Sequence, residues 1–283
     1  MHPAITILRP KQWIKNAFVF APCVFALQFN NIADLRRAII ATLCFIAVSS
    51  AVYIFNDFMD LADDRNHPTK KFRPLASGKI GVKKASLLMV FLLFLGYALC
   101  NFLPHACFVI MLIYLIFNIS YSKALKKYAI IDVLIIATGF VLRVLMGGYA
   151  IEVQVSSWII LSTFLLALFL AFGKRYNEMN IEGSKQRQSL KGYNKDVLGK
   201  MITVSCSAAL ICYGIYATDI ARKTGKDAFV YTVIFVVFGL FRYLQIIFVN
   251  DGGGEPEKIL FRDKIFLLNL VLWLICSVSI LIY

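Results

Sequence analysis

Four aspartates gather where a long apolar run ends. The run from Ala38 to Phe55 carries no charged side chain, and the segment from Asn56 to Asp64 follows it directly. If one helix continues through this segment, Asp57, Asp60 and Asp64 lie at i, i+3 and i+7 on one face. Carboxylates at a membrane boundary repel one another unless cations neutralise them. The spacing therefore predicts three metal ligands for a hard cation such as Mg²⁺, the arrangement that a pyrophosphate-handling enzyme needs.

Basic residues follow the aspartates at once. A site that holds metal and phosphate together needs carboxylates for the ion and Lys or Arg for the phosphate oxygens. The alternative is a solvated loop whose charges anchor the helix end, which would explain the basic residues but not four acids at its root. His67 precedes Pro68, and shaping the turn is the favoured role for it. The predicted substrate-binding residues here are Asn56, Arg65, Lys70 and Arg73.

A second charged segment, Gly173 to Glu182, ends a later apolar run. Glu178 and Glu182 are spaced i, i+4, so a helix would align them. The alternative is an ordinary helix end flanked by positive charge. This acidic pair emerges on the same predicted membrane face as the aspartates, which favours a functional role. Glu178 is a candidate catalytic residue, and Lys174 and Arg175 are candidate substrate-binding residues.

Other polar residues lie at or within the apolar runs. Lys11 and Lys15 are spaced i, i+4 and would line a common pocket or face lipid phosphates; both alternatives stay open. Tyr121 and Lys123 end an apolar run on the predicted cytoplasmic face. Arg143 lies inside another run, where a charge is costly and a functional or paired role is the default. All five are candidate substrate-binding residues.

Composition defines the elements that must position these residues. The chain has 283 residues, 60% of them hydrophobic, and a mean hydropathy of +0.74. A soluble domain has roughly 45–50% apolar residues, and only helices or closed barrels span lipid. The apolar runs approach the length of spanning helices. We predict an all-α membrane protein with one polytopic domain over residues 1–283, polar loops at 58–84 and 174–196, and nine apolar segments at about 17–30, 38–57, 85–102, 104–121, 129–149, 155–173, 197–218, 228–249 and 265–283.

Charge distribution predicts the orientation. With the N-terminus in the cytoplasm, 23 Lys and Arg residues lie on that side, five lie opposite and two fall within segments. The positive-inside rule therefore places the N-terminus and both long loops in the cytoplasm. The net charge of +14 then reflects this bias and affinity for anionic lipid and phosphorylated substrates, rather than nucleic acid. The seven cysteines form no CxxC pair, which argues against a zinc site or a disulfide framework.

The run Asn56-Asp57-x-x-Asp60-x-x-x-Asp64 resembles the first aspartate-rich motif of the UbiA superfamily of intramembrane prenyltransferases. The resemblance covers essentially the whole chain and implies nine transmembrane helices around a cytoplasm-facing cavity. Three further segments are similar to the decaprenyl-phosphate phosphoribosyltransferase branch, namely Leu8-Arg9-Pro10-Lys11-Gln12-Trp13-Ile14-Lys15-Asn16, Asp64-Arg65-Asn66-His67-Pro68 with Lys70, Arg73 and Pro74, and Gly173-Lys174-Arg175 with Glu178.

The resemblance implies a Mg²⁺-dependent glycosyltransferase of cell-envelope biosynthesis. It would transfer 5-phosphoribose from phosphoribosyl pyrophosphate to a polyprenyl phosphate of the decaprenyl type, in the plasma (inner) membrane, and a homo-oligomer is compatible with it. Arg73 and Lys70 would stabilise the leaving pyrophosphate. Members that prenylate aromatic acceptors carry an aspartate pair where this chain has Lys174, Arg175 and Glu178. That difference suits a donor with an additional 5-phosphate.

Two alternatives remain at this point. One is prenyl transfer from a polyprenyl diphosphate to an aromatic or glycerophosphate acceptor. The other is a cation-coupled transporter, which should carry polar residues at the bilayer midplane. Here the acids crowd one predicted face, and only Arg143 and Arg242 fall deep within segments.

Overall fold

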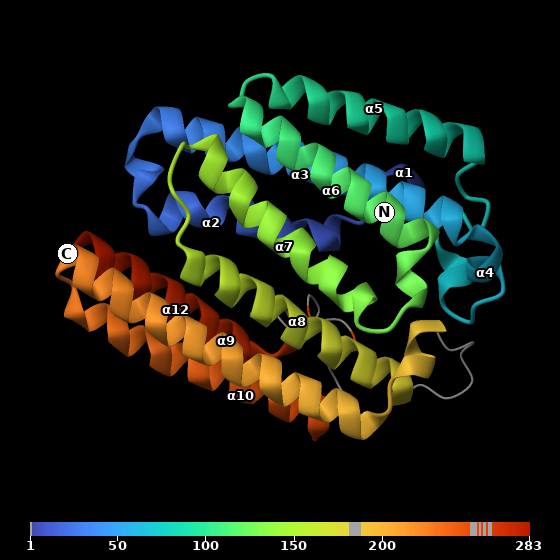
Figure 1. Ribbon diagram of the computed structural model, residues 1–283. Coiled ribbons are helices and arrows are strands. Elements are labelled where there is room, and N and C mark those ends of the chain that lie inside the picture. The colour runs from blue at the N-terminus through green and yellow to red at the C-terminus, as the bar shows by residue number, and fades with distance from the viewer. Residues whose placement is uncertain (1, 181–187, 250–253, 255, 257–258, 260–261) are drawn as a thin grey trace. The chain divides into compact units, whose positions relative to one another are not determined.

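The computed structural model describes residues 2–180, 188–249, 254, 256, 259 and 262–283, and these residues form helices with no strand among them. Eight of the nine predicted apolar segments form long helices (Figure 1). In the described residues eight stretches are long and apolar enough to cross a membrane, so the chain is a multi-pass membrane protein. The long helices are α3 (Ile32–Met59), α5 (Val82–Cys100), α6 (His105–Lys123), α7 (Ile131–Ala150), α8 (Ser157–Asn180), α9 (Lys195–Thr224), α10 (Val233–Phe248), which the 3₁₀ helix η6 (Asp227–Thr232) precedes, and α12 (Lys264–Ile282).

The first predicted segment, residues 17–30, is shorter than a membrane span. It contains helix α2 (Ala17–Phe25), which has nine residues and Pro22 inside it. Leu27 then adopts a left-handed conformation with φ 54°, which ends the helix before the short turn η2 (Gln28–Asn30). Nine helical residues rise only about 14 Å, against roughly 30 Å for the bilayer core.

The chain divides into two compact units. Unit 1 takes the described residues up to Lys127 together with Leu142–Gln154, and unit 2 takes most of the remainder. In unit 1, α3 packs against α2, α5 and α6. Gly96 on α5 permits the close approach to α3, since a Cβ there would collide with the Val48 side chain. Gly147 does the same for α7 against α2, because a Cβ would collide with the Val19 carbonyl.

Unit 2 is built on the pairing of α8 with α9. Its core includes Phe169 of α8, Leu198 and Ile202 of α9, and Tyr243 and Ile247 of α10, all nearly inaccessible to solvent. Helix α7 serves both units, its residues up to Val141 belonging to unit 2 and those from Leu142 to unit 1. The prediction of one domain therefore stays a prediction, because the division concerns packing and not independent folding.

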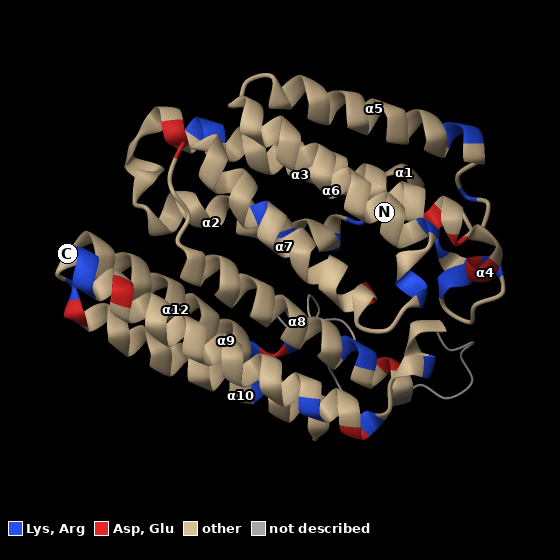
Figure 2. Ribbon diagram, viewed as in Figure 1, with Lys and Arg blue, Asp and Glu red and all other residues tan. Residues whose placement is uncertain are grey.

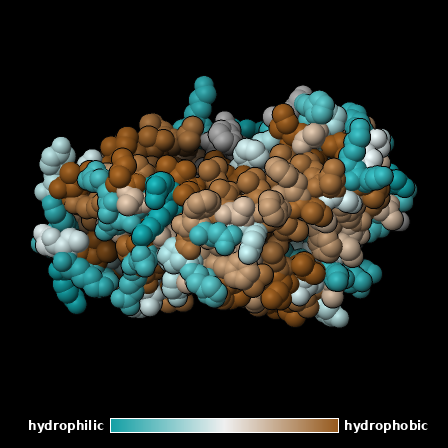
Figure 3. Space-filling view, turned by 90° about the horizontal axis from the view of Figure 1, so that it is seen from above, coloured by the Kyte–Doolittle hydropathy of each residue, from teal (hydrophilic) through white to brown (hydrophobic). Residues whose placement is uncertain are grey.

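Charged residues lie mainly at or near helix ends within each unit (Figure 2). Apolar side chains cover much of the face seen in Figure 3, as expected where lipid replaces water. The predicted loops contain helical structure of their own. Helix α4 (Leu61–Arg65) and the turn η3 (Lys70–Phe72) lie within 58–84, while α8 continues to Asn180 and η5 (Gln188–Gly192) follows within 174–196.

Candidate functional site

Helix α3 does not continue through the aspartates as one helix. It ends at Met59, Asp60 leaves the helical conformation with φ −98° and ψ 3°, and α4 begins at Leu61. Two backbone hydrogen bonds carry the chain across this break, from Asp60 N to Asn56 O at 3.0 Å and from Asp64 N to Asp60 O at 2.8 Å. The prediction that Asp57, Asp60 and Asp64 stack on one continuous helical face is therefore wrong at Asp60.

Asp57 and Asp64 converge on one arginine. Arg73 Nη1 lies 3.2 Å from Asp57 Oδ1 and 2.6 Å from Asp64 Oδ2. Arg9 Nη2 also contacts Asp57 Oδ1. The two carboxylate side chains are 2% and 3% exposed, whereas both arginines are 27% exposed. The acids are thus buried and the cations that neutralise them reach in from the surface.

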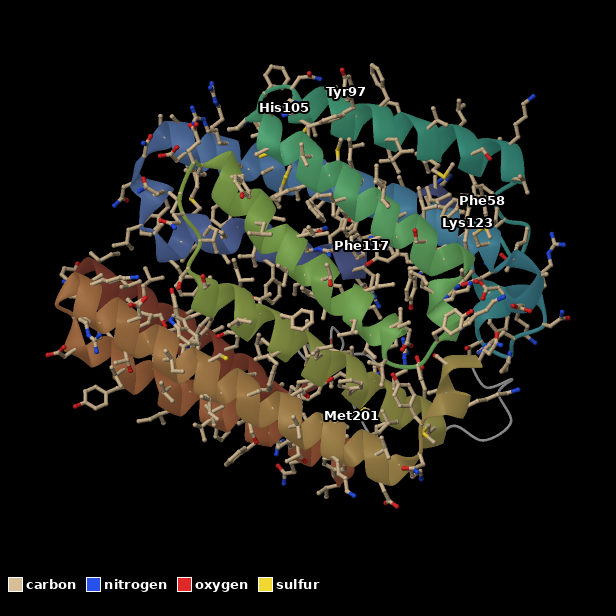
Figure 4. The ribbon with its side chains drawn as sticks, in the orientation of Figure 1. Phe58, Tyr97, His105, Phe117, Lys123 and Met201 are labelled. Atoms are coloured by element: carbon tan, nitrogen blue, oxygen red, sulfur yellow. The ribbon has the colours of Figure 1, made fainter. Side chains whose placement is uncertain are left out.

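Asp60 has a different partner. Lys126 in the turn η4 (Leu125–Lys127) contacts Asp60 Oδ1, and the Asp60 side chain is 31% exposed. Next to it, the Ser122 hydroxyl donates to Asn56 Oδ1 and links the end of α6 to the end of α3. Figure 4 shows Phe58 and Lys123 at this same end of unit 1. We call Asp57, Asp60 and Asp64, with Arg9, Arg73 and Lys126, the aspartate cluster.

The side-chain types of the aspartate cluster suit Mg²⁺, but their arrangement in this structure does not form a metal site. Carboxylate and amide oxygens are the donors that this cation prefers. The described residues nevertheless hold no group of three His, Cys, Asp or Glu side chains arranged around a metal position. Arg9, Arg73 and Lys126 supply the positive charge instead. Metal binding would require these carboxylates to turn from the basic side chains toward the ion, and the metal assignment stays a prediction.

The remaining basic candidates of unit 1 lie nearer the surface. Arg65, Lys70 and Lys123 are exposed, and their side chains make no ion pair with a described residue. Lys11 and Lys15 lie on η1 (Pro10–Asn16), which is a 3₁₀ helix. With three residues per turn, positions four apart point about a third of a turn away from each other. These two lysines therefore do not share a face as an α-helix would have required. Tyr121 is half-buried on α6.

Arg143 is buried within unit 1, at 5% exposure. Its Nε donates to Asn16 Oδ1 at 3.0 Å and its Nη2 to the Tyr114 hydroxyl at 3.2 Å. The guanidinium also lies over the rings of Phe45 and Tyr114, at 5.0 and 5.1 Å from their centroids. These hydrogen bonds and ring contacts stabilise the Arg143 charge among apolar helices, in agreement with a paired role. Substrate binding by Arg143 stays a prediction.

Unit 2 contains a second acid–base group, which we call the buried-acid network. Arg175 of α8 is 1% exposed; its Nε lies 2.8 Å from Asp132 Oδ2 and its Nη1 lies 2.7 Å from Glu178 Oε2. Ser189 and Tyr193 donate their hydroxyls to the same Asp132 at 3.0 and 3.3 Å. Burial raises the pKa of Tyr193 to about 12, so its hydroxyl stays protonated and donates a hydrogen bond to Asp132.

Glu178 is therefore held by an arginine that is itself fixed by Asp132. Its side chain is 27% exposed, and Lys174 on the preceding turn is half-buried. Glu182, the predicted partner of Glu178, lies outside the described residues, so the proposed pair is not tested. The assignments of Glu178, Lys174 and Arg175 to substrate stay predictions.

Several residues of these two groups were not assigned by sequence reasoning. Arg9 and Lys126 stand in basic segments that the sequence singled out, yet nothing in their spacing predicts which acid they meet. Arg9 adopts a left-handed backbone with φ 53° directly before Pro10, and its side chain also lies over the Tyr53 ring at 5.1 Å. Asp132 lies in the first turn of α7, where acids are common in any helix, so the sequence does not indicate its contact with Arg175.

Comparison with known proteins decides the family. A family model described as the UbiA prenyltransferase family matches residues 17–279. The chain belongs to the UbiA prenyltransferase family. It is accordingly a transferase and a membrane enzyme, as the sequence predicted.

Relatives within the UbiA family extend over nearly the full length. The decaprenyl-phosphate phosphoribosyltransferase of Mycolicibacterium smegmatis is 32% identical, with 95% of this chain and 89% of the relative covered. The protein of the same name from Corynebacterium glutamicum is also 32% identical, with 97% and 85% covered. These values confirm the predicted resemblance.

Solved structures agree on the fold. A UbiA homolog from Archaeoglobus fulgidus, bound to DMAPP and Mg²⁺, superposes with a TM-score of 0.76 at 19% identity over 98% of both chains. A structure from work on digeranylgeranylglyceryl phosphate synthase gives a TM-score of 0.68 at 20% identity. The predicted all-α UbiA fold is confirmed, with eight candidate spans and the short α2 among the described residues.

Proposed function

We propose that this UbiA family member transfers 5-phosphoribose from phosphoribosyl pyrophosphate to a polyprenyl phosphate of the decaprenyl type and releases pyrophosphate. The observation that carries the proposal is the 32% identity, over nearly the whole chain, to relatives named decaprenyl-phosphate phosphoribosyltransferase. The aspartate cluster supports it, because buried carboxylates beside surface-reaching Arg and Lys side chains suit a metal–pyrophosphate group.

In this proposal Asp57, Asp60 and Asp64 would hold Mg²⁺, which would neutralise charge on the donor pyrophosphate. Arg9, Arg73 and Lys126 would then no longer be needed to neutralise the carboxylates. Arg73 and the exposed Lys70 lie on the chain that follows α4 and donate to the pyrophosphate oxygens. Their charge matters most when the C1–oxygen bond of the donor breaks and the leaving group gains negative charge.

The acceptor supplies the nucleophile. A phosphate oxygen of the polyprenyl phosphate attacks C1 of the ribose, forming a new C1–O bond while the bond to pyrophosphate breaks. That oxygen is already ionised near neutral pH, since a phosphate monoester carries −1.5 to −2 charges. No strong general base is needed, and none of the described residues is assigned that role.

By the resemblance alone, Lys174 would bind the 5-phosphate of the donor and Glu178 would accept a hydrogen bond from a ribose hydroxyl. Arg175 positions Glu178 through its 2.7 Å contact and is itself fixed by Asp132. The charge count favours a cytoplasmic N-terminus and a cytoplasmic aspartate cluster, on the side where a soluble phosphorylated donor is available. The plasma membrane is proposed by the resemblance alone.

The deciding experiment uses the full-length protein in nanodiscs. Radiolabelled phosphoribosyl pyrophosphate with polyprenyl phosphate should yield a labelled lipid, whereas labelled prenyl diphosphate with a glycerophosphate or aromatic acceptor should not. Chelation with EDTA should abolish the product and Mg²⁺ should restore it. A labelled product only from the prenyl donor would replace this function with prenyl transfer.

Two variants show whether the aspartate cluster carries the reaction. Asp57→Asn removes a carboxylate that contacts Arg9 and Arg73 and should lower turnover about 100-fold or more. Asp63→Asn is the matched control, because Asp63 belongs to the same acidic segment, lies on the short helix α4, is exposed and makes no ion pair with a described residue. Equal loss in both variants would contradict the assignment.

A further inference from the structure

An open cavity of about 580 Å³ lies in unit 2, and none of its lining residues belongs to the aspartate cluster or to the buried-acid network. Helix α9 supplies most of its wall, with α8 and α10 closing one side through Tyr176 and Phe248. Met201, labelled on α9 in Figure 4, packs instead against the core of unit 2. The cavity therefore opens on the face of α9 that the protein core leaves uncovered.

The cavity has a charged end and an apolar end. Lys195 and Lys200 are exposed and make no ion pair with a described residue. Val204, one turn further along α9, is 69% exposed, and Phe248 is 43% exposed. The Phe248 ring meets the Tyr176 ring edge-to-face, with centroids 5.0 Å apart. A path from Lys200 to Val204 runs about 6 Å along the helix axis, from cationic to apolar surface.

A gradient of this kind is expected where a membrane changes from headgroups to hydrocarbon. Helix α9 is long and apolar enough to cross a membrane, and Lys195 is its first residue. Lysines at the end of a spanning helix reach lipid phosphates while their neighbours further in contact acyl chains. A soluble anion would use the two lysines but would gain nothing from exposed Val204 and Phe248.

We propose that this cavity binds one anionic phospholipid of the surrounding bilayer, with its phosphate between Lys195 and Lys200 and an acyl chain along Val204 and Phe248. The local charge favours a phosphodiester lipid over a polyprenyl monophosphate. Two lysines and the exposed lining residue Asp196 sum to one positive charge, which matches the single negative charge of a phosphodiester. A phosphate monoester carries nearly two negative charges.

The chain offers a clean way to block the cavity. A Cβ built on Gly199, which lines it, meets no atom within 4 Å, so Gly199→Leu should place its side chain in the open space. Gly214, on the same helix, also has open space around its Cβ position and does not line the cavity. Gly214→Leu is therefore the matched control for both helix propensity and added bulk.

The contribution of the two lysines is tested with a separate pair of double variants. Lys195→Gln/Lys200→Gln removes both cationic groups. Arg222→Gln/Lys226→Gln removes two charges near the other end of α9, and neither of those side chains makes an ion pair with a described residue. The thermal midpoint of each variant is recorded first, so that only folded proteins are compared.

The measurement is lipid binding without turnover, so its outcome is independent of the proposed reaction. Full-length protein in phosphatidylcholine nanodiscs is titrated with phosphatidylglycerol, and retained lipids are counted by native mass spectrometry. The wild type should retain one phosphatidylglycerol. Each lysine is expected to contribute about fivefold, so the double variant should bind about 25-fold more weakly, and Gly199→Leu should lose the bound lipid while both controls keep it.

Three results would overturn the proposal. The first is unchanged phosphatidylglycerol retention in Gly199→Leu and in the lysine variant. The second is equal loss in the controls, which would indicate general surface charge. The third is displacement of the phosphatidylglycerol by glycerol phosphate or by polyprenyl phosphate at lower concentration, which would identify a soluble-anion site or an acceptor site instead.

Discussion

The aspartate cluster of unit 1 and the buried-acid network of unit 2 use the same chemistry in opposite surroundings. In both, an arginine bridges two carboxylates. Arg73, which contacts Asp57 and Asp64, keeps 27% of its side chain exposed. Arg175, which contacts Asp132 and Glu178, keeps 1%. An arginine at the surface can exchange a carboxylate for a ligand, whereas one sealed in a core must keep its partner because a buried unpaired charge is costly.

The hydrogen-bond partners of the acids also differ between the two groups. Asp132 accepts from two hydroxyls besides Arg175, so its oxygens are engaged by groups that belong to the fold. The acids of the aspartate cluster contact only long basic side chains among the described interactions. We infer that the Asp132–Arg175 pair of the buried-acid network maintains structure, whereas the aspartate cluster is free to rearrange around a substrate.

The largest expected effect comes from breaking the buried-acid network. Arg175→Met leaves Asp132 buried without its cation and should lower the free energy of unfolding by about 3–5 kcal/mol. Chemical unfolding in detergent, followed by tryptophan fluorescence, measures it. The double variant Asp132→Leu/Arg175→Met should recover part of that loss, since no charge stays buried. If Arg73→Met costs as much as Arg175→Met, the comparison between the two groups fails.

The second-largest expected effect is a loss of turnover when Arg73 of the aspartate cluster is replaced. Arg73→Gln should lower kcat/KM about 100-fold, because the leaving pyrophosphate loses a cationic donor. Arg73→Lys keeps the charge but loses the planar fork and should recover part of the rate. Steady-state formation of labelled lipid measures both, with the exposed Lys79→Gln as control. A large loss of stability in place of activity would assign Arg73 to structure.

A smaller effect is expected for Tyr193→Phe. The Tyr193 hydroxyl accepts from the Ile130 backbone N–H and donates to Asp132, while its ring meets Phe172 edge-to-face and would be kept. Loss of these hydrogen bonds should cost about 1–2 kcal/mol of unfolding free energy. Tyr231→Phe, on an exposed side chain of the same unit, should cost almost nothing, and an equal loss there would remove the special role of Tyr193.

The smallest effect is a pH response at His67, beside the aspartate cluster. His67 Nδ1 accepts from the backbone N–H groups of Thr69 and Lys70 at 3.2 and 3.3 Å. Burial and the neighbouring Lys70 lower the pKa of His67 below its ordinary value. The neutral ring therefore stabilises the fold at pH values above about 6.5, and this contribution is lost as the pH falls through the lowered pKa.

Titration of ¹³C-labelled His67 by NMR measures that response, and the change in stability should stay within about 0.5 kcal/mol. His67→Gln should abolish the pH dependence in this range. A pKa above 6.5 would mean that the acids next to His67 dominate, and that the basic side chains neutralise the aspartate cluster less completely than its contacts indicate.

Sequence reasoning reached the fold more fully than the site. The apolar segments from 38–57 onward were found with bounds within seven residues of the helices, because a spanning helix needs a long stretch without charge. The first segment was different. Pro22 and the left-handed Leu27 shorten it to helix α2, and a hydropathy run alone does not show where a backbone turns.

Within the site, the acids were identified and their partners were not. The pairs Arg9–Asp57, Lys126–Asp60 and Arg175–Asp132 join residues 48, 66 and 43 positions apart. No spacing rule relates such residues, because their meeting depends on which helices pack together. The i, i+3, i+7 argument also assumed an unbroken α-helix, and the turn at Asp60 sends that carboxylate to Lys126 while its neighbours go to Arg73.

The sequence by itself determined that this protein is a helical membrane protein with an acidic motif followed by basic residues, because hydrophobic length and charge order are properties of the chain alone. Only the tertiary structure decided which acids are neutralised from the surface and which are sealed in a core. It did so because burial and long-range pairing arise when helices pack, and the same Asp–Arg contact is exchangeable at a surface and fixed inside.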